Sequence, residues 1–215
     1  MAIDAKICGL STPETLEVAV AEGAAYVGFV FFAKSPRCVT LEQAAALAAR
    51  VPERVRRVGL VVDPEDDFLQ ALVARVPLEI LQLHGREAPA RVAAVRQATG
   101  REVMKVLPVA EAADLEAVGP YLPVADRLMF DAKPPAAMKN ALPGGNAVAF
   151  DWKILSGRSF PRPWMLAGGL RAETVAEAVA TSGARTVDVS SGVESAPGIK
   201  DPEKIRAFLR AVRAL

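Results

Sequence analysis

The chain has few of the residues that cross-link small domains or bind metals. Its 215 residues include only two cysteines, Cys8 and Cys38, and a single histidine, His84. Two cysteines cannot build a disulfide framework, and their separation matches no metal-binding spacing. We therefore expect neither a disulfide-dependent fold nor a metal centre.

An excess of one charge and long apolar runs are missing as well. The chain has 26 basic and 25 acidic residues, a formal net charge of +1. This balance predicts no nucleic-acid or membrane surface, so an anionic ligand would have to be held by a local arrangement. No apolar run approaches the ~20 residues needed to span a bilayer, and Asp4 and Lys6 interrupt any apolar signal core. We expect a cytoplasmic protein.

Aromatic residues are scarce, whereas small aliphatic residues are abundant. Aromatics make up 6% of the sequence and hydrophobic residues of all kinds 52%, with alanine and valine prominent among them. This composition favours helices packed on parallel strands over an antiparallel sandwich. The length allows one large domain or two small ones, either with a sizeable core.

Short β-like runs alternate with helical patterns along the whole chain, and no domain boundary interrupts them. The predicted strands are 3–8, 25–32, 57–62, 79–83, 103–107, 127–130, 164–167 and 186–189. The predicted helices are 13–22, 40–50, 65–75, 88–99, 110–118, 150–155, 171–182 and 202–212. Eight such units favour a closed (β/α)8 barrel formed by residues 1–215 as a single domain. An open doubly wound sheet is the alternative, although Cys8-Gly9-Leu10-Ser11 lacks its G-x-G-x-x-G fingerprint.

A closed barrel brings the carboxyl ends of all its strands to one rim, where barrel enzymes keep their active sites. The residues expected on this rim are Cys8, Arg37, Asp63, His84, Asp131, Gly168, Gly169, Asp188, Ser190, Ser191 and Gly192. The irregular segment 132–149 also follows a predicted strand. It is longer than the ~2–6 residues usual for such connections, so we expect it to be a functional loop.

Glycine-rich turns follow the last two predicted strands. Gly168-Gly169 ends one strand, and Ser190-Ser191-Gly192 ends the next. Barrels often bind phosphate at these two positions, because glycine lets the backbone N–H groups approach the anion. Either turn alone could be an ordinary tight turn before a helix. Both together predict a phosphate site.

Cys8 and Asp131 would face each other across the rim as a base and an acid. The alternatives are a cysteine buried for packing and an aspartate that caps a turn. A useful base must be largely thiolate, so we expect Cys8 to be accessible and reactive. Arg37 could bind a carboxylate or simply be solvated. His84 is left without a role.

Six sequence blocks carry a resemblance to a known family. They are Lys6-Ile7-Cys8-Gly9, Lys34-Ser35-Pro36-Arg37, Gln82-Leu83-His84-Gly85, Phe150-Asp151-Trp152, Leu166-Ala167-Gly168-Gly169-Leu170 and the run from Val187 to Glu194. In this order they resemble the signature blocks of the phosphoribosylanthranilate isomerase family, over residues 3 to about 209. The resemblance implies a (β/α)8 barrel without metal or organic cofactor. It implies the third step of tryptophan biosynthesis, an Amadori rearrangement of N-(5-phosphoribosyl)anthranilate to 1-(2-carboxyphenylamino)-1-deoxyribulose 5-phosphate.

The resemblance also implies roles for residues. Asp131 would protonate the furanose oxygen and open the ring, and Cys8 would remove the sugar C2 proton. Arg37 would hold the anthranilate carboxylate, and Asp188 would support the reacting centre. The phosphate would rest on the backbones of Gly168-Gly169 and Ser191-Gly192. The partner would be a phosphorylated small molecule, with the protein a monomer or homodimer.

Two stretches depart from the family, and two other readings stay open. The loop before Arg37 usually carries a tyrosine and a proline, where this chain has Phe32-Ala33. The family often has a Gly-Thr-Gly-like stretch before Phe150, where this chain reads GGNAVA over 144–149. A sister sugar isomerase of histidine biosynthesis catalyses the same rearrangement, with an aspartate in place of Cys8. A non-catalytic barrel that binds phosphate ligands would not need Cys8 and Asp131 together. The lysine and glutamate of indole-glycerol-phosphate synthase are not found on this rim.

Overall fold

Eight parallel strands close into a barrel in chain order in the computed structural model of the protein, which describes residues 2–135, 137, 138, 142–146 and 148–215. The strands are β1 (Asp4–Cys8), β2 (Tyr26–Val30), β3 (Arg56–Val61), β4 (Ile80–Leu83), β5 (Glu102–Val109), β6 (Arg127–Ala132), β7 (Trp164–Leu166) and β8 (Thr186–Val189). β1 closes the barrel by pairing with β8, with Asp4 opposite Thr186. The predicted barrel is confirmed.

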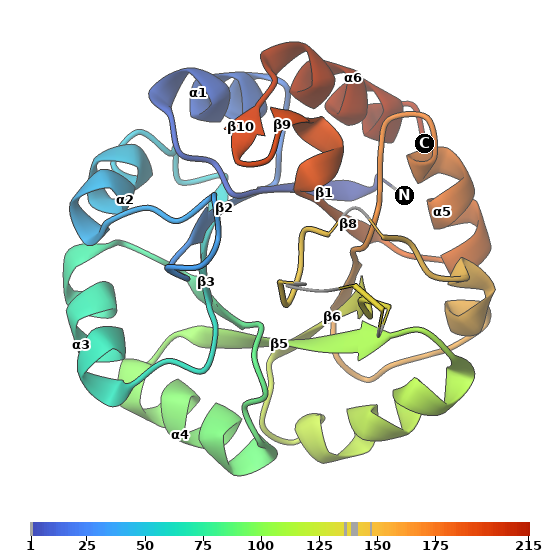
Figure 1. The fold of residues 1–215 in the computed structure, drawn as a ribbon, viewed down its shortest axis with the longest axis horizontal. Coiled ribbons are helices and arrows are strands. Elements are labelled where there is room, and N and C mark those ends of the chain that lie inside the picture. Colours follow the sequence, from blue (N-terminus) through green and yellow to red (C-terminus); the bar gives the residue numbers. More distant parts are fainter. Residues whose placement is uncertain (1, 136, 139–141, 147) are drawn as a thin grey trace.

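Helices surround the strands on all sides (Figure 1). They are α1 (Pro13–Ala21), α2 (Leu41–Ala48), α3 (Asp66–Arg75), α4 (Pro89–Thr99), α5 (Val175–Ser182) and α6 (Pro202–Arg213), with the 3-10 helices η1 (Ala112–Tyr121), η2 (Trp152–Leu155) and η3 (Ser191–Val193). Thr12, Thr40 and Asp201 cap α1, α2 and α6. Each side-chain oxygen accepts a hydrogen bond from a first-turn N–H that has no partner within the helix.

The structure differs from the predicted elements in three places. The helix expected over 110–118 is the 3-10 helix η1, which contains Pro120, a residue without an N–H to donate. α5 begins at Val175 instead of 171, because the Thr174 hydroxyl accepts a hydrogen bond from the N–H of Arg171 and holds a turn there. A hairpin of β9 (Glu194–Ala196) and β10 (Ile199–Lys200) was not predicted; its turn contains Gly198, whose φ is +83°.

The core has two layers. Most buried side chains pack between the barrel and the helices, and a second group fills the barrel interior. The interior group is Tyr26, Val58, Ile80, Met104, Val106, Met129, Met165 and Ala167. Full burial of one such aliphatic side chain contributes about 1.5–3 kcal/mol. The barrel is therefore a packed scaffold that fixes the strand ends.

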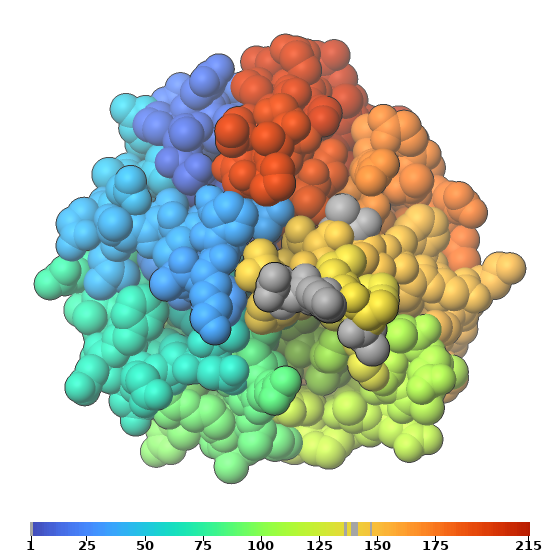
Figure 2. Space-filling model, in the orientation of Figure 1, coloured from blue at the N-terminus to red at the C-terminus, as the bar shows by residue number. Residues whose placement is uncertain are grey.

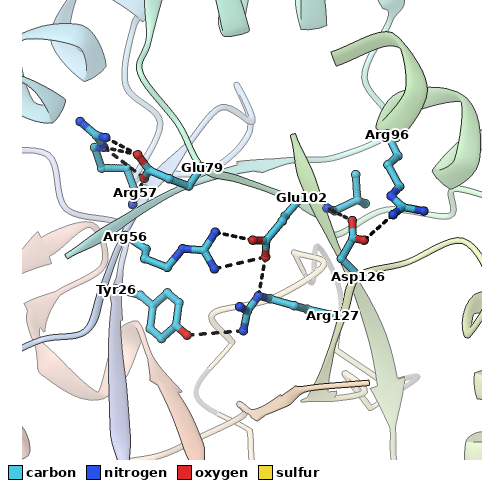
Figure 3. Close-up of polar contacts among 9 residues, drawn as sticks. Tyr26, Arg56, Arg57, Glu79, Arg96, Glu102, Asp126 and Arg127 are labelled. Atoms are coloured by element: carbon cyan, nitrogen blue, oxygen red, sulfur yellow. Dashed lines mark hydrogen bonds and ion pairs between the residues drawn. The ribbon is translucent and has the colours of Figure 1, made fainter. Parts of the chain in front are cut away.

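Ion pairs gather at the amino ends of the strands, and some of them link strands that are not adjacent in the barrel (Figure 3). Glu102 lies between Arg56 and Arg127, at 2.7 Å and 2.8 Å, and Arg127 reaches the hydroxyl of Tyr26 at 3.5 Å. Hydrogen bonds from Arg56 and then Arg127 hold the pKa of Glu102 below its ordinary value. Further pairs are Arg57–Glu79 and Arg96–Asp126. These ion pairs stabilise the rim at the amino ends of the strands. Active sites of barrel enzymes lie on the opposite rim, at the carboxyl ends.

In the part of the chain that the structure describes, no helix combines the length and the apolar character needed to cross a membrane.

Candidate active site

A pocket opens at the carboxyl ends of the strands, and every site residue predicted from the sequence lines it. These residues are Cys8, Arg37, Asp131, Gly168, Gly169, Asp188, Ser191 and Gly192. Gln82 and His84 line it too. Asp63, also expected on this rim, is used in a turn: its carboxylate accepts a hydrogen bond from the N–H of Arg86 at 2.7 Å.

Cys8 is the last residue of β1, and Lys6 lies two residues before it on the same, inward face of the strand. Lys6 is completely buried, and its Nζ lies 2.7 Å from Oδ1 of Asp188 on β8. Burial disfavours its charge, yet the carboxylate of Asp188 and the thiol of Cys8 raise the pKa of Lys6 above its ordinary value. A buried cation thus lies next to the proposed base.

Cys8 is itself buried, with 3% of its surface exposed. Burial raises the pKa of the Cys8 thiol above its ordinary value, and the nearby charge of Asp188 raises it further. Lys6 and Lys200 act in the opposite direction without reversing the shift. The expectation of an accessible thiolate is therefore wrong for the protein without a ligand. The period-two pattern of β1 could have identified Lys6 as the neighbour of Cys8.

Asp131 lies near the end of β6 and contacts a residue that had no assigned role. Its Oδ1 accepts a hydrogen bond from the N–H of Ala132 at 2.9 Å, and its Oδ2 lies 3.2 Å from Nε2 of His84. Nδ1 of His84 lies 3.3 Å from the Gln82 side-chain nitrogen. The His84 ring therefore lies between the Gln82 amide, at Nδ1, and the Asp131 carboxylate, at Nε2.

Arg37 follows β2, and its guanidinium is held by the β9–β10 hairpin. Nε and Nη2 donate to the two carboxylate oxygens of Glu194, at 2.7 Å and 2.8 Å. Nζ of Lys200 lies 2.7 Å from the same Oε1 that Nε contacts. Burial works against the charge of Glu194, but hydrogen bonds from Arg37 and the charge of Lys200 leave its pKa below the ordinary value. Glu194 ends the last of the six sequence blocks but had been given no role, and no sequence signal had pointed to Lys200.

The glycines after β7 and β8 have no room for a side chain. Gly168 and Gly169 have φ of +91° and +65°, a left-handed conformation that other residues rarely adopt. A Cβ on Gly168 would lie 2.7 Å from the N of Ala132, and one on Gly192 would collide with the carbonyl of Leu170. These glycines therefore pack too closely against other backbone for a side chain, and they line the pocket at the predicted phosphate end.

The described part of the loop after β6 lies over the barrel mouth (Figures 1 and 2). A Cβ on Gly144 would collide with His84 and lie 2.8 Å from Oδ2 of Asp131. The carbonyl of Gly145 accepts a hydrogen bond from Nη2 of Arg37 at 3.3 Å. Residues 136, 139–141 and 147 of the predicted functional loop lie outside the described residues. Gly144 and Gly145 therefore lie between Asp131 and Arg37 at the mouth of the pocket.

Comparisons with known proteins agree with this geometry. The family model for "N-(5'phosphoribosyl)anthranilate (PRA) isomerase" matches residues 5–211. An isomerase of this name from Paramagnetospirillum magneticum is 59% identical over 213 residues, which are 99% of this chain and 98% of that protein. Another from Paracoccus denitrificans is 56% identical over 215 residues, 100% of this chain and 99% of that protein.

Solved structures give the same result. The phosphoribosyl anthranilate isomerase of Thermotoga maritima matches with a TM-score of 0.88 at 32% identity, over 99% of this chain and all of that one. A phosphoribosyl anthranilate isomerase in complex with reduced 1-(o-carboxyphenylamino)-1-deoxyribulose 5-phosphate matches with a TM-score of 0.83 at 30% identity, with 99% and 100% covered.

Proposed function

The chain belongs to the N-(5'-phosphoribosyl)anthranilate isomerase family, and we propose that Cys8 and Asp131 perform the two proton transfers of its reaction. The enzyme converts N-(5-phosphoribosyl)anthranilate to 1-(2-carboxyphenylamino)-1-deoxyribulose 5-phosphate in tryptophan biosynthesis. One observation carries the assignment of roles. A thiol, a carboxyl group, an arginine and two glycine turns line one pocket from five different strand ends.

The first step is the acid-catalysed opening of the furanose ring. Asp131, as a carboxylic acid, gives its proton to the ring oxygen while the C1–O bond breaks. The lone pair of the anthranilate nitrogen forms the C1=N bond, and the nitrogen becomes a cationic iminium. Nε2 of His84 lies 3.2 Å from the carboxyl oxygen and helps to position the Asp131 side chain, and Gln82 contacts the other ring nitrogen. The proton that Cys8 later takes from C2 returns to Asp131 through solvent, so that both groups regain their starting states.

The second step is the removal of the sugar C2 proton by Cys8. The electrons of the C2–H bond form a C1=C2 bond, and those of the C=N bond return to nitrogen, which gives a neutral enolamine. Reprotonation at C1 and loss of the C2 hydroxyl proton yield the ketone. The iminium is a cation, and with Lys6 it favours the thiolate at the moment when the base is needed. The raised pKa of Cys8 in the free protein is thus compatible with its role.

The two anionic ends of the substrate would be held by different kinds of group, a charged side chain at one end and backbone N–H groups at the other. Arg37 supplies a guanidinium, fixed by Glu194, whose Nη1 donors can meet the anthranilate carboxylate. The backbones of Gly168-Gly169 and Ser191-Gly192 receive the phosphate, where the lack of Cβ atoms permits close approach. Asp188 supports the centre indirectly, because its carboxylate fixes Lys6 beside Cys8.

Family membership decides between this reaction and the alternatives, the sister isomerase and the non-catalytic barrel. Conversion of freshly prepared substrate, followed as loss of anthranilate fluorescence, tests the activity, and substitution of Cys8 and Asp131 tests the roles. A cytoplasmic location and a monomeric or homodimeric state belong to the same proposal. Cell fractionation and sedimentation equilibrium test them.

A further inference from the structure

We propose that Glu194 and Lys200 are positioning residues that aim Arg37 at the carboxylate of the substrate and keep this cluster cationic. The inference rests on the proposed role of Arg37. It concerns the β9–β10 hairpin, which lies between β8 and α6 and carries both residues at its base.

The hairpin packs directly against the loop that carries Arg37. Figure 2 shows the red atoms of this segment against the blue atoms of the loop after β2. A Cβ on Gly198, in the hairpin turn, would lie 2.6 Å from the carbonyl oxygen of Pro36. The N–H of Gly198 also donates to Oε2 of Glu194 at 3.3 Å. The hairpin therefore supports the loop through its turn as well as through Glu194.

Glu194 occupies the Nε and Nη2 edge of the guanidinium, and the donors on Nη1 are left for a ligand. Arginine has five N–H donors in a fixed plane. Two of them go to Glu194, and a third goes to the carbonyl of Gly145. The two donors on Nη1 make no hydrogen bond to any residue in the described ranges. Arg37 itself lines the pocket. A long side chain that would otherwise sample many rotamers is thus already fixed before the ligand arrives, which lowers the entropic cost of binding.

Lys200 adds a positive charge beside the Arg37–Glu194 pair. A bidentate Arg37–Glu194 pair is neutral as a unit and would attract a second carboxylate only weakly. Nζ of Lys200, 2.7 Å from Glu194, restores a net charge of +1 to the cluster of three. All three residues are buried, at 5%, 8% and 7% exposure, so the charge acts with little solvent screening.

Lys200 is also fixed from the side of the catalytic strands. Its Nζ donates to the carbonyl oxygen of Ser190 at 2.8 Å and lies 3.2 Å from the hydroxyl of that residue. The hydroxyl of Ser190 in turn donates to the carbonyl of Cys8 at 3.2 Å. A chain of hydrogen bonds through Ser190, Lys200 and Glu194 therefore connects Arg37 with β1, the strand that carries the proposed base.

Two ligands that differ only in the carboxylate test the proposal. One is the reduced product, 1-(2-carboxyphenylamino)-1-deoxyribulose 5-phosphate after reduction, and the other is its phenylamino counterpart without the carboxyl group. Calorimetric titration of Lys200→Met should show at least roughly tenfold weaker binding of the first ligand, the scale of one charged hydrogen bond. Glu194→Gln releases the guanidinium but raises the net charge of the cluster, so it should weaken the first ligand by a smaller factor. Binding of the second should change by less than about twofold, and the substrate KM should rise in both variants. The value of kcat should stay within about twofold in Glu194→Gln and fall further in Lys200→Met, because Lys200 also lowers the pKa of the Cys8 thiol.

The controls separate three outcomes. Glu102→Gln is the matched control, since Glu102 also lies between two cations but on the opposite rim (Figure 3), and its KM should equal that of the unsubstituted protein. If Arg37→Ala weakens both ligands equally, the carboxylate role of Arg37 itself is wrong. If Arg37→Ala is selective for the carboxylate and Lys200→Met is not, the positioning role is overturned. Should Glu194→Gln fail to fold, Lys200→Met decides, because it leaves the Arg37–Glu194 pair intact.

Discussion

Lys6 and Asp188 form an ion pair at the floor of the active site, with 2.7 Å between Nζ and Oδ1 and no exposed surface on Lys6. The pair connects the first strand of the barrel with the last, across the line where the barrel closes. It also places a cation next to the Cys8 thiol, which lowers the pKa of a group that burial would otherwise raise further. One contact therefore joins the two strands that close the barrel and sets the electrostatic surroundings of the proposed base.

Removal of the lysine from this pair should damage stability and catalysis together. Lys6→Met leaves the Asp188 carboxylate buried without a partner, so the free energy of unfolding should fall by about 3–5 kcal/mol. The pKa of Cys8 should rise further, which lowers kcat near neutral pH. Urea denaturation and the pH profile of kcat measure the two effects. In the control, Arg50→Met breaks the exposed pair with Glu17 and should cost at most about 1 kcal/mol. Equal losses in the two variants would contradict the role given to the buried pair.

Substitution of either proposed catalytic residue should lower kcat far more than substitution of a residue outside the pocket. Cys8→Ser and Asp131→Asn should each lower kcat by about 10²–10⁴, the usual contribution of a general base or acid. The fluorescence decay of the anthranilate substrate measures this. Cys38→Ser, at the exposed cysteine, should keep full activity. A kcat equal to that of the unsubstituted protein in either catalytic variant would remove that residue from the mechanism.

The reactivity of the two cysteines should follow their exposure. Cys38 is exposed and Cys8 is buried, so iodoacetamide should modify Cys38 first and leave activity intact. Because the pKa of Cys8 lies above its ordinary 9.0, modification of Cys8 should become appreciable only at more alkaline pH, with activity lost in parallel. Mass spectrometry of peptides after timed exposure distinguishes the sites. Faster modification of Cys8 at pH 7 would mean that the free protein already holds a thiolate.

Stability should decline in acid because of the ion pairs on the opposite rim. Burial opposes the charge of Glu79, but hydrogen bonds from Arg57 leave its pKa below the ordinary 4.5, and hydrogen bonds from Arg56 lower that of Glu102. A carboxylate with a lowered pKa in the folded state stabilises the protein above about pH 4.5, and this contribution disappears as pH falls through the folded-state pKa. Urea midpoints between pH 7 and pH 3 should show this decline, and Glu102→Gln should flatten it. Identical slopes in both proteins would refute the assignment to Glu102.

Much of the site could be predicted from the sequence, because in a parallel barrel a residue that follows a strand in the sequence lies on a known rim of the structure. Cys8, Asp131 and Asp188 each lie at or next to the end of an apolar run, and closure brings such ends to one rim. Local patterns were therefore sufficient to predict which side chains share the pocket. The glycines after β7 and β8 were predictable for the same reason, since both end strands that are neighbours in the chain and in the barrel.

The tertiary structure alone decided the electrostatics of that pocket. Arg37 and Glu194 are 157 residues apart, and no periodicity relates a loop after β2 to a short hairpin after β8. The contact of His84 with Asp131 and the burial of Cys8 likewise depend on how distant elements pack. A sequence pattern reports the local preferences of the backbone and which face of an element is apolar. The pKa of a thiol or the direction of a guanidinium depends on charges and burial within a few ångströms, and only the closed fold determines which groups those are.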